Sequence, residues 1–143
     1  MADSRRLAGR RGARYGAVQA VYRWLMNAAP TREILAEVAQ WEHLENAHQG
    51  LLESLVRETI GAREALDAQL EPCLDRPVAQ LDPMEHAVLL VATFELGHSL
   101  ELPRKVVINE AVELAKLFGA TGAHRYVNGV LDRLSRELRP TGT

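Results

Sequence analysis

Apolar residues along this chain recur at the three-to-four spacing of α-helices, and no stretch shows the period-two alternation of β-strands. Between residues 11 and 27, one apolar stripe predicts an amphipathic helix with a basic outer surface. The arginines predicted to stay outside this stripe are Arg11, Arg14 and Arg23. Pro30 stops the helix, and Thr31 is the predicted N-cap of a short helix that continues through Ala39.

A second long pattern, from Glu45 to Leu70, predicts an acidic helix in which Gly61 is a weak point. Pro72 and Pro77 then interrupt the helical pattern. We therefore expect the seam between two halves of the chain to lie at these prolines.

The C-terminal half opens with a strong helix-start signal. Asp82 is the predicted N-cap, Pro83 the first helical residue and Glu85 the capping-box residue. This helix is expected to reach about Leu96. Because residues 87–94 are apolar on nearly every side, the helix should be the buried centre of this half.

Two more helices follow, one that starts at Pro103 and one over residues 123–138. Asn128 and Gly129 form a turn signal inside the last helix, which indicates a close approach of another helix at this point. We expect Asn128 and Asn109 to be buried amides of the scaffold.

The predicted fold class is all-α, with about seven helices in two packed bundles. We expect one domain over residues 1–143, with an N-terminal bundle of about residues 1–76 and a C-terminal bundle of about residues 77–143. A chain of this length can bury one sizeable core.

Charge is distributed unevenly, although the formal net charge is only −2. Residues 1–27 carry a net charge of +5, residues 28–101 carry −10 and residues 102–143 carry +3. If the fold brings the two basic ends together, they are expected to form a binding site for a polyanion. The acidic middle is expected to bind a basic protein. A merely solvated charged surface is the alternative for each segment.

Membrane and secreted classes are not expected. The longest apolar run, residues 87–94, is far shorter than the roughly 20 residues of a membrane-spanning helix. The arginine-rich first residues are not followed by the apolar stretch and cleavage site of a secretory signal. The single cysteine, Cys73, fits a reducing cytosol, so a cytoplasmic location is expected.

The chain shows no recognisable catalytic set, so we expect no enzyme, no metal and no cofactor. Its five histidines contain no i, i+4 pair that would clamp a metal from one helix face. Cys73 lies in no nucleophile motif, and residues 119–122 lack the Gly-Lys-Ser/Thr ending of a phosphate-binding loop.

An arginine cluster is the best candidate for binding chemistry; it comprises Arg5, Arg6, Arg10, Arg11 and Arg14. Guanidinium groups match phosphate oxygens in pairs, and binding through several phosphates weakens steeply as salt rises. Tyr15 and Tyr22 are candidates for stacking on the bases of single-stranded RNA. Tyr22 also lies on the apolar stripe, so a core role is an equal alternative. The residues predict an RNA-binding adaptor.

Two stretches near the C-terminus carry a family resemblance. Residues 106–119 read VVINEAVELAKLFG, and residues 125–134 read RYVNGVLDRL. Together with RRGAR at residues 10–14 and AVQAVY at residues 17–22, these stretches closely resemble the NusB family of transcription antitermination factors. The resemblance covers most of the chain, densely in its C-terminal half and thinly in its middle.

The resemblance implies a non-catalytic protein of about seven helices in two bundles. It also implies a partner, the small-subunit ribosomal protein NusE. With NusE, members of the family recognise boxA, a single-stranded RNA element of ribosomal RNA transcripts, and help the RNA polymerase elongation complex pass terminators. This function agrees with the basic ends and the acidic middle of the chain. A homodimer remains open.

Candidate site residues follow from the arginine cluster and from the resemblance. The RNA-binding candidates are Arg6, Arg10, Arg11, Arg14, Tyr22, Lys105, Lys116, Arg125 and Tyr126. In the acidic middle, Asp82 and Glu85 are the candidates for contact with the protein partner.

The chain also departs from the family pattern. Leu90 replaces an arginine often found in the central helix, and Gly122 and Ala123 replace polar residues before the last helix. Both changes remove groups that would touch RNA or a partner. The region around Ala47 and His48 lacks aromatic residues common in the family.

Two alternatives to the adaptor stay open. One family of RNA-modifying methyltransferases carries a NusB-like domain, and this chain would then be a detached copy, because it contains no Gly-rich nucleotide-binding unit. The other alternative is a purely protein-binding helical module whose arginines are only solvated.

Overall fold

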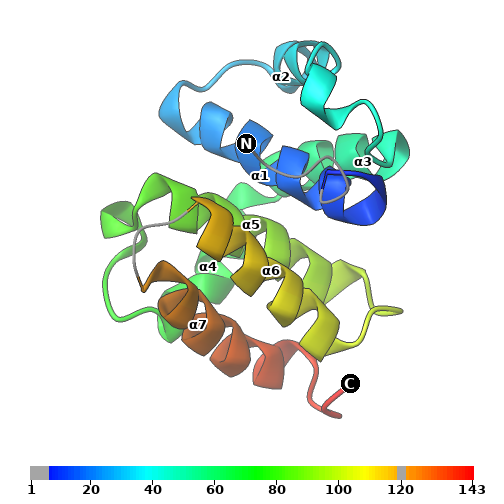
Figure 1. The fold of residues 1–143 in the computed structure, drawn as a ribbon. Helices are drawn as coiled ribbons and strands as arrows, with labels where there is room; N and C mark the ends of the chain where they lie inside the picture. The colour runs from blue at the N-terminus through cyan, green and yellow to red at the C-terminus, as the bar shows by residue number, and fades with distance from the viewer. Residues whose placement is uncertain (1–6, 119–121) are drawn as a thin grey trace. The chain divides into compact units, whose positions relative to one another are not determined.

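A computed structural model of the protein describes residues 7–118 and 122–143. Within that part of the chain the regular elements are all helical, as Figure 1 shows, so the all-α prediction is confirmed. In chain order they are α1 (Gly9–Met26), α2 (Thr31–Val38), η1 (Glu42–Leu44), α3 (Gln49–Gly61), α4 (Arg63–Leu70), η2 (Glu71–Cys73), η3 (Val78–Gln80), α5 (Pro83–His98), α6 (Arg104–Phe118) and α7 (Ala123–Leu138). The seven α-helices match the expected number.

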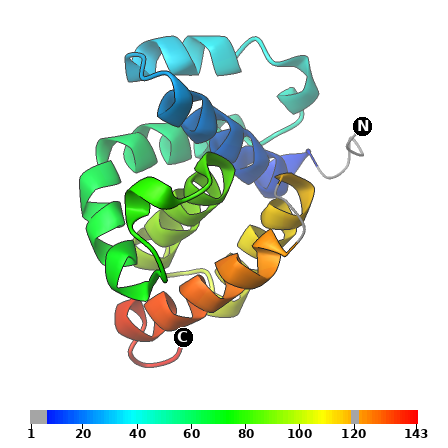
Figure 2. The same ribbon diagram turned by 90° about the vertical axis from the view of Figure 1, so that its left-hand side faces the viewer.

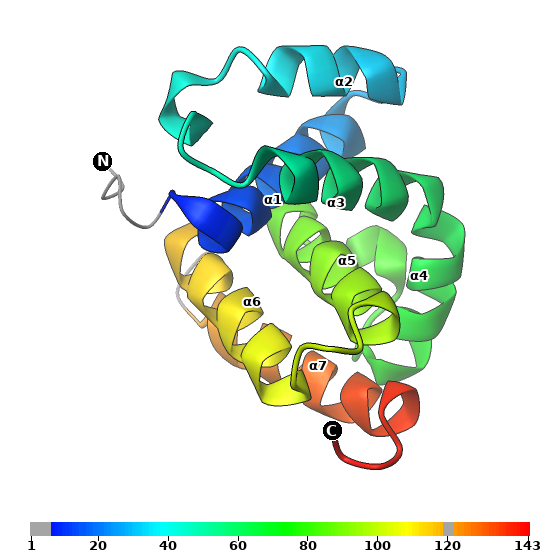
Figure 3. The same cartoon turned by 90° about the vertical axis from the view of Figure 1, so that its right-hand side faces the viewer.

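The chain forms two compact units, residues 1–61 and residues 62–143. In the first unit α1 packs along α3, and α2 contacts both helices (Figure 3). Two glycines allow α1 to pack closely against neighbouring segments, Gly12 against residue 7 and Gly16 against η1. A Cβ atom at Gly12 would overlap the carbonyl oxygen of Leu7, and one at Gly16 would lie 2.6 Å from Cδ1 of Leu44.

Gly9 determines where α1 begins. Its φ of +59° lies in the left-handed region, which glycine enters without steric cost. Its N–H donates to the carbonyl of Asn46 and its carbonyl accepts from the N–H of His48, each at 2.9 Å. The first turn of the arginine-bearing helix is thereby held against the segment before α3.

The predicted N-cap at Thr31 was wrong, and the helix predicted over residues 45–70 is divided at its predicted weak point, Gly61. Pro30 precedes α2 in an extended conformation, and Thr31 is the first helical residue and makes no capping hydrogen bond. The helix predicted over residues 45–70 is divided, because α3 ends at Gly61 and α4 begins at Arg63. Glycine costs about 1 kcal/mol in a helix, and the chain breaks at this position.

The division between the units also falls earlier than the predicted seam near residue 76. Helix α4 packs on α5, so residues 62–76 belong to the second unit. The carboxylate of Asp67 on α4 lies 2.7 Å from Nε2 of His86 on α5 and accepts a 3.1 Å hydrogen bond from Arg63. This half-buried network fastens the two helices together.

Helix α5 is the core of the second unit, as predicted. Every residue from 86 to 96 is buried, among α4, α6 and α7 (Figure 3). The predicted N-cap is confirmed, because Oδ1 of Asp82 accepts hydrogen bonds from the N–H groups of Met84 and Glu85 at 2.9 and 3.2 Å. Pro83 is the first residue of the helix.

A buried arginine that the sequence did not single out holds the opposite end of α5. Arg139 is 5% exposed and donates to the carbonyls of Leu96, Ser99 and Leu102 at 2.8, 3.1 and 2.7 Å. It also donates to the carbonyl of Thr143, so the C-terminal segment turns back beside the end of α7 (Figure 2).

In the described residues, no helix combines the length and apolar character needed to span a membrane.

Replacing Gly12 by alanine is expected to destabilise the protein by about 1–3 kcal/mol, because the new methyl group would meet backbone that cannot move aside. Gly61→Ala is the matched control, since a Cβ atom there has no neighbour within 4 Å and φ is not positive. It should be neutral or stabilising by up to about 1 kcal/mol. Urea denaturation of both variants measures the difference. Equal stabilities would contradict the close packing at Gly12.

Asp67→Asn is expected to destabilise the protein in a pH-dependent manner. Burial raises the pKa of Asp67, but hydrogen bonds from His86 and Arg63 outweigh burial and bring it below its usual 3.8. The stabilisation by the carboxylate is therefore complete above about pH 4 and is lost as the pH falls further.

Urea denaturation between pH 2 and pH 7 should show the wild-type protein and Asp67→Asn converging at the acidic end. The control is Glu53→Gln, which removes one partner of an exposed pair with Arg57 and should change stability by less than about 1 kcal/mol. A difference between wild type and Asp67→Asn that does not vary with pH would contradict this account.

Candidate nucleic-acid interface

The arginine-rich segment is divided between the surface and the core. Arg10 and Arg11 are exposed on the first turn of α1, as predicted. The prediction that Arg14 stays outside was wrong, because its side chain is only 5% exposed. Arg14 is in helical register with the buried residues Ala17, Val18 and Val21. Tyr22 is half-buried, and Arg6 lies outside the described residues.

Three rings of the first unit gather into what we call the aromatic cluster: Tyr15, Trp41 and His43. The imidazole of His43 stacks on the Trp41 indole at 5.7 Å between ring centroids, with 22° between the planes. Tyr15 of α1 meets His43 edge-on at 6.2 Å. Only Tyr15 was a sequence candidate. Trp41 and His43 come from the distant α2–α3 connection, so no local pattern could reveal them.

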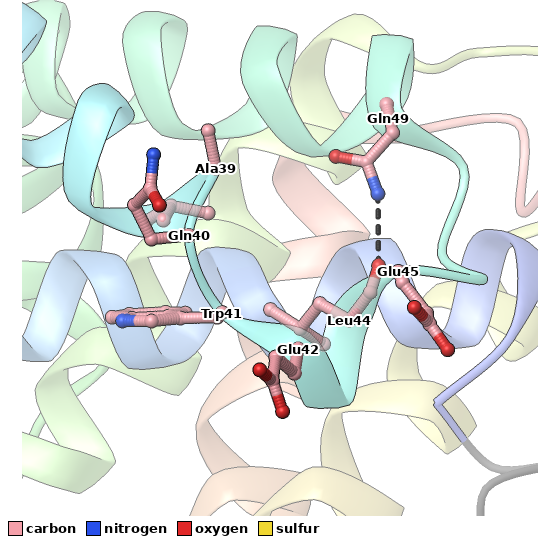
Figure 4. A pocket seen from close by; sticks show the side chains of 8 residues that line it. Ala39, Gln40, Trp41, Glu42, Leu44, Glu45 and Gln49 are labelled. Atoms are coloured by element: carbon pink, nitrogen blue, oxygen red, sulfur yellow. Dashed lines mark hydrogen bonds between the residues drawn. The ribbon is translucent and has the colours of Figure 1, made fainter.

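An open pocket of about 540 Å³ adjoins this cluster, because Trp41 also lines it. Its wall runs from the end of α2 through η1 to Gln49 at the start of α3 (Figure 4). Nε2 of Gln49 donates to the carbonyl of Leu44 at 2.8 Å. Glu42 and Glu45 also line the pocket, so its charged side chains are both acidic.

In the second unit, Lys116 and Arg125 are exposed at the same end of the α6–α7 pair. Lys116 forms an exposed pair with Glu113, with 3.3 Å between Nζ and Oε1. Lys105 lies at the other end of α6, roughly 16 Å away along the helix axis. It lines a shallow pocket with Leu100 and Thr143. The fold therefore brings together only two of these three basic side chains.

Tyr126 is half-buried and already packed by neighbouring groups. The guanidinium of Arg76 lies 4.6 Å from its ring centroid, and its hydroxyl accepts a 3.5 Å hydrogen bond from the N–H of Asp75. Asp75 pairs with Arg76 at 2.6 Å. Hydrogen bonds from Arg76 and Tyr126 lower the pKa of Asp75 to about 2. Sequence reasoning missed Arg76, which is 50 residues away from Tyr126 in the chain.

The two amides expected in the core, Asn109 and Asn128, are exposed instead. Asn109 lies one turn after Lys105 on α6, and Asn128 lies three residues after Arg125 on α7. No close helix approach occurs at Gly129, where a Cβ atom would meet only the side chain of Arg133 at 3.6 Å. Both amides thus add hydrogen-bonding groups to the basic faces of their helices.

The acidic candidates lie at the start of α5. Asp82 is exposed, and one of its carboxylate oxygens accepts the hydrogen bonds that cap the helix. Glu85 is half-buried, and burial together with the neighbouring charge of Asp82 raises its pKa. Among residues 7–118 and 122–143, no group of three His, Cys, Asp or Glu side chains lies close enough together to hold a metal ion.

Comparison with known proteins places this geometry in context. Residues 11–136 match the model of the NusB family. The transcription antitermination protein NusB of Paraburkholderia xenovorans (strain LB400) is 48% identical over 136 residues, which cover 95% of this chain and 94% of the relative. The corresponding protein of Paraburkholderia phytofirmans (strain DSM 17436 / LMG 22146 / PsJN) is 48% identical over 132 residues, with 92% of each chain covered.

Two solved structures share the fold. A structure of NusB from T. maritima superposes with a TM-score of 0.78 at 23% identity and covers 98% of this chain and 95% of its own. The crystal structure of the antitermination factors NusB and NusE in complex with double-stranded RNA gives a TM-score of 0.78 at 26% identity. That match covers 88% of this chain and 95% of the other.

The cap at Asp82 can be separated from its charge by two substitutions. Asp82→Ala is expected to cost about 1 kcal/mol of stability, because two N–H groups at the start of α5 lose their acceptor. Asp82→Asn keeps an acceptor oxygen and should remain close to the wild-type stability. Thermal denaturation compares the two. If Asp82→Asn is destabilised as much as Asp82→Ala, capping is not what this side chain contributes.

Proposed function

This chain belongs to the NusB family of transcription antitermination proteins, and we propose that it binds boxA-type single-stranded RNA together with NusE. The observation that carries the proposal is that cations assigned from the family resemblance, Arg10 and Arg11 on α1 and Lys116 with Arg125 on α6–α7, are exposed. A solved NusB structure of the same fold contains NusE and RNA, which supports both as partners.

Phosphate recognition is assigned to the exposed arginines at the start of α1. Arg10 and Arg11 each present a planar guanidinium that can pair with two phosphate oxygens. Because Arg14 is buried, it is assigned to the packing of α1 and not to phosphate contact. Lys116 and Arg125 supply a second pair of basic side chains, and half-buried Tyr22 is assigned a contact with the RNA.

The remaining candidates on α6 and α7 have narrower roles in this proposal. Lys105, at the far end of α6, adds a distant electrostatic contact with the RNA. Tyr126 has a structural role in this proposal, because the guanidinium of Arg76 already covers its ring. The protein acts by binding and not by catalysis.

The acidic segment supplies the surface for a basic protein. Residues 28–101 carry a net charge of −10, and Asp82 and Glu85 place two carboxyl groups on the first turn of α5. Charge complementarity of this kind speeds association and selects among partners. As a cytoplasmic adaptor, the chain would thus join RNA to NusE and so to the RNA polymerase elongation complex. A homodimer formed through the basic surface would compete with RNA.

The double variant Arg10→Ala/Arg11→Ala tests the proposal. We expect its affinity for a boxA-like RNA to fall at least about tenfold at low salt, with and without NusE. The slope of log K against log salt should become shallower by about 1.4, because two phosphate contacts are lost from a single strand. Fluorescence anisotropy at several salt concentrations measures both quantities.

Arg32→Ala/Arg57→Ala is the matched control, because it removes two exposed arginines from α2 and α3 of the same unit. It should bind RNA almost as the wild type does. If the control loses as much affinity as the α1 variant, net charge and not a located site governs binding. If the α1 variant binds as tightly as wild type, the arginine helix is not the RNA site.

A further inference from the structure

The aromatic cluster occupies a place where core packing does not explain it. The whole chain has only seven Phe, Trp and Tyr residues, and two of them meet His43 here. His43 is exposed, and Tyr15 and Trp41 are only half-buried. Each of these rings therefore keeps part of its surface in contact with water, where a ligand can reach it.

The cluster is also held in place before any ligand arrives. Nε2 of His43 and Oε1 of Gln19 on α1 lie 2.9 Å apart, within hydrogen-bond distance. Leu44, the next residue, is buried beside Gly16, so η1 is also anchored against α1 at this point. Rings whose positions are already set lose little conformational freedom on binding.

The row of side chains along α1 connects this cluster to the basic surface. Arg11, Tyr15 and Gln19 are spaced four residues apart, so they follow one face of the helix at intervals of roughly 6 Å. Arg11 is exposed at the start of the row. A cation for phosphate followed by aromatic faces for bases is the arrangement with which proteins hold single-stranded nucleic acid.

We propose that the aromatic cluster of Tyr15, Trp41 and His43 is a base-stacking platform for single-stranded RNA whose phosphates are held by Arg11. The inference rests on the proposed RNA-binding function and adds base contacts that the arginines do not provide. Stacking tolerates any base, so the platform contributes affinity more than sequence preference. The RNA enters from the Arg11 side, because Glu42 and Glu45 line the pocket beside Trp41 and repel phosphate.

The fluorescence of Trp41 gives a direct readout. The chain has two tryptophans, so in a Trp24→Phe protein the emission comes from Trp41 alone. A boxA-like single-stranded RNA should quench or shift this emission in step with binding. A fully paired RNA of the same length should not, because its bases are not free to stack on the ring.

Substitution tests the contribution of each ring to affinity. His43→Ala and Trp41→Ala should each weaken RNA binding roughly 5- to 100-fold, as loss of one stacked base does. The salt slope should stay as in the wild type, in contrast to Arg10→Ala/Arg11→Ala, because no phosphate contact is lost. Gln40→Ala, an exposed neighbour without a ring, is the matched control and should bind normally.

Binding to abasic RNA distinguishes the loss of a base contact from the effect of a variant that merely folds poorly. An abasic nucleotide at the stacked position should weaken binding to the wild type but add no further loss in His43→Ala, whose side chain is exposed in the free protein. Normal RNA binding by His43→Ala and Trp41→Ala, with arginine-dependent binding intact, overturns the platform and leaves the proposed function standing. Loss of NusE binding with RNA binding retained assigns the cluster to a protein contact. A wild-type protein that does not bind RNA overturns both proposals.

Discussion

Burial of residues 86–96 of α5 is the constraint on which the second unit depends. A helix that is apolar on nearly every side must be covered by neighbours, here α4, α6 and α7, and its end groups need hydrogen-bond partners. Asp82 supplies the hydrogen-bond acceptor at the start of the helix. The guanidinium of Arg139 donates hydrogen bonds to the carbonyls at and after the end of the helix. The covering helices keep their polar faces outward, which is why Lys116 and Arg125 are exposed.

In the first unit the corresponding constraint is the close approach of α1 to α3 and the loop before it. Gly12 and Gly16 allow this contact and thereby set the rotation of α1 about its axis. That rotation exposes Arg10 and Arg11 and turns Arg14 inward. The arginine-rich segment therefore contributes both the exposed side chains of the proposed phosphate contacts and part of the packing that presents them.

The proposed RNA binding combines electrostatics with stacking. Phosphate contacts by arginine give affinity that depends on salt, whereas aromatic contacts give affinity that does not. Tyr15 lies one turn after Arg11 on α1. The proposed phosphate contact and the proposed stacking contact therefore share one face of the helix. Leu90, which departs from the family pattern, is fully buried in α5, so the exposed basic side chains of the proposed site are those of α1, α6 and α7.

The helices, the cap at Asp82, the buried α5 and the family could all be predicted from the sequence, because periodicity, capping and motifs are properties of neighbouring residues. The burial of Arg14 was within reach too, since it shares a register with Val18 and Val21. Only the tertiary structure decided which distant groups meet: Arg139 with the end of α5, Arg76 with Tyr126, and Tyr15 with His43. Such contacts join residues 28 to 50 positions apart, and packing alone, not local pattern, brings them together.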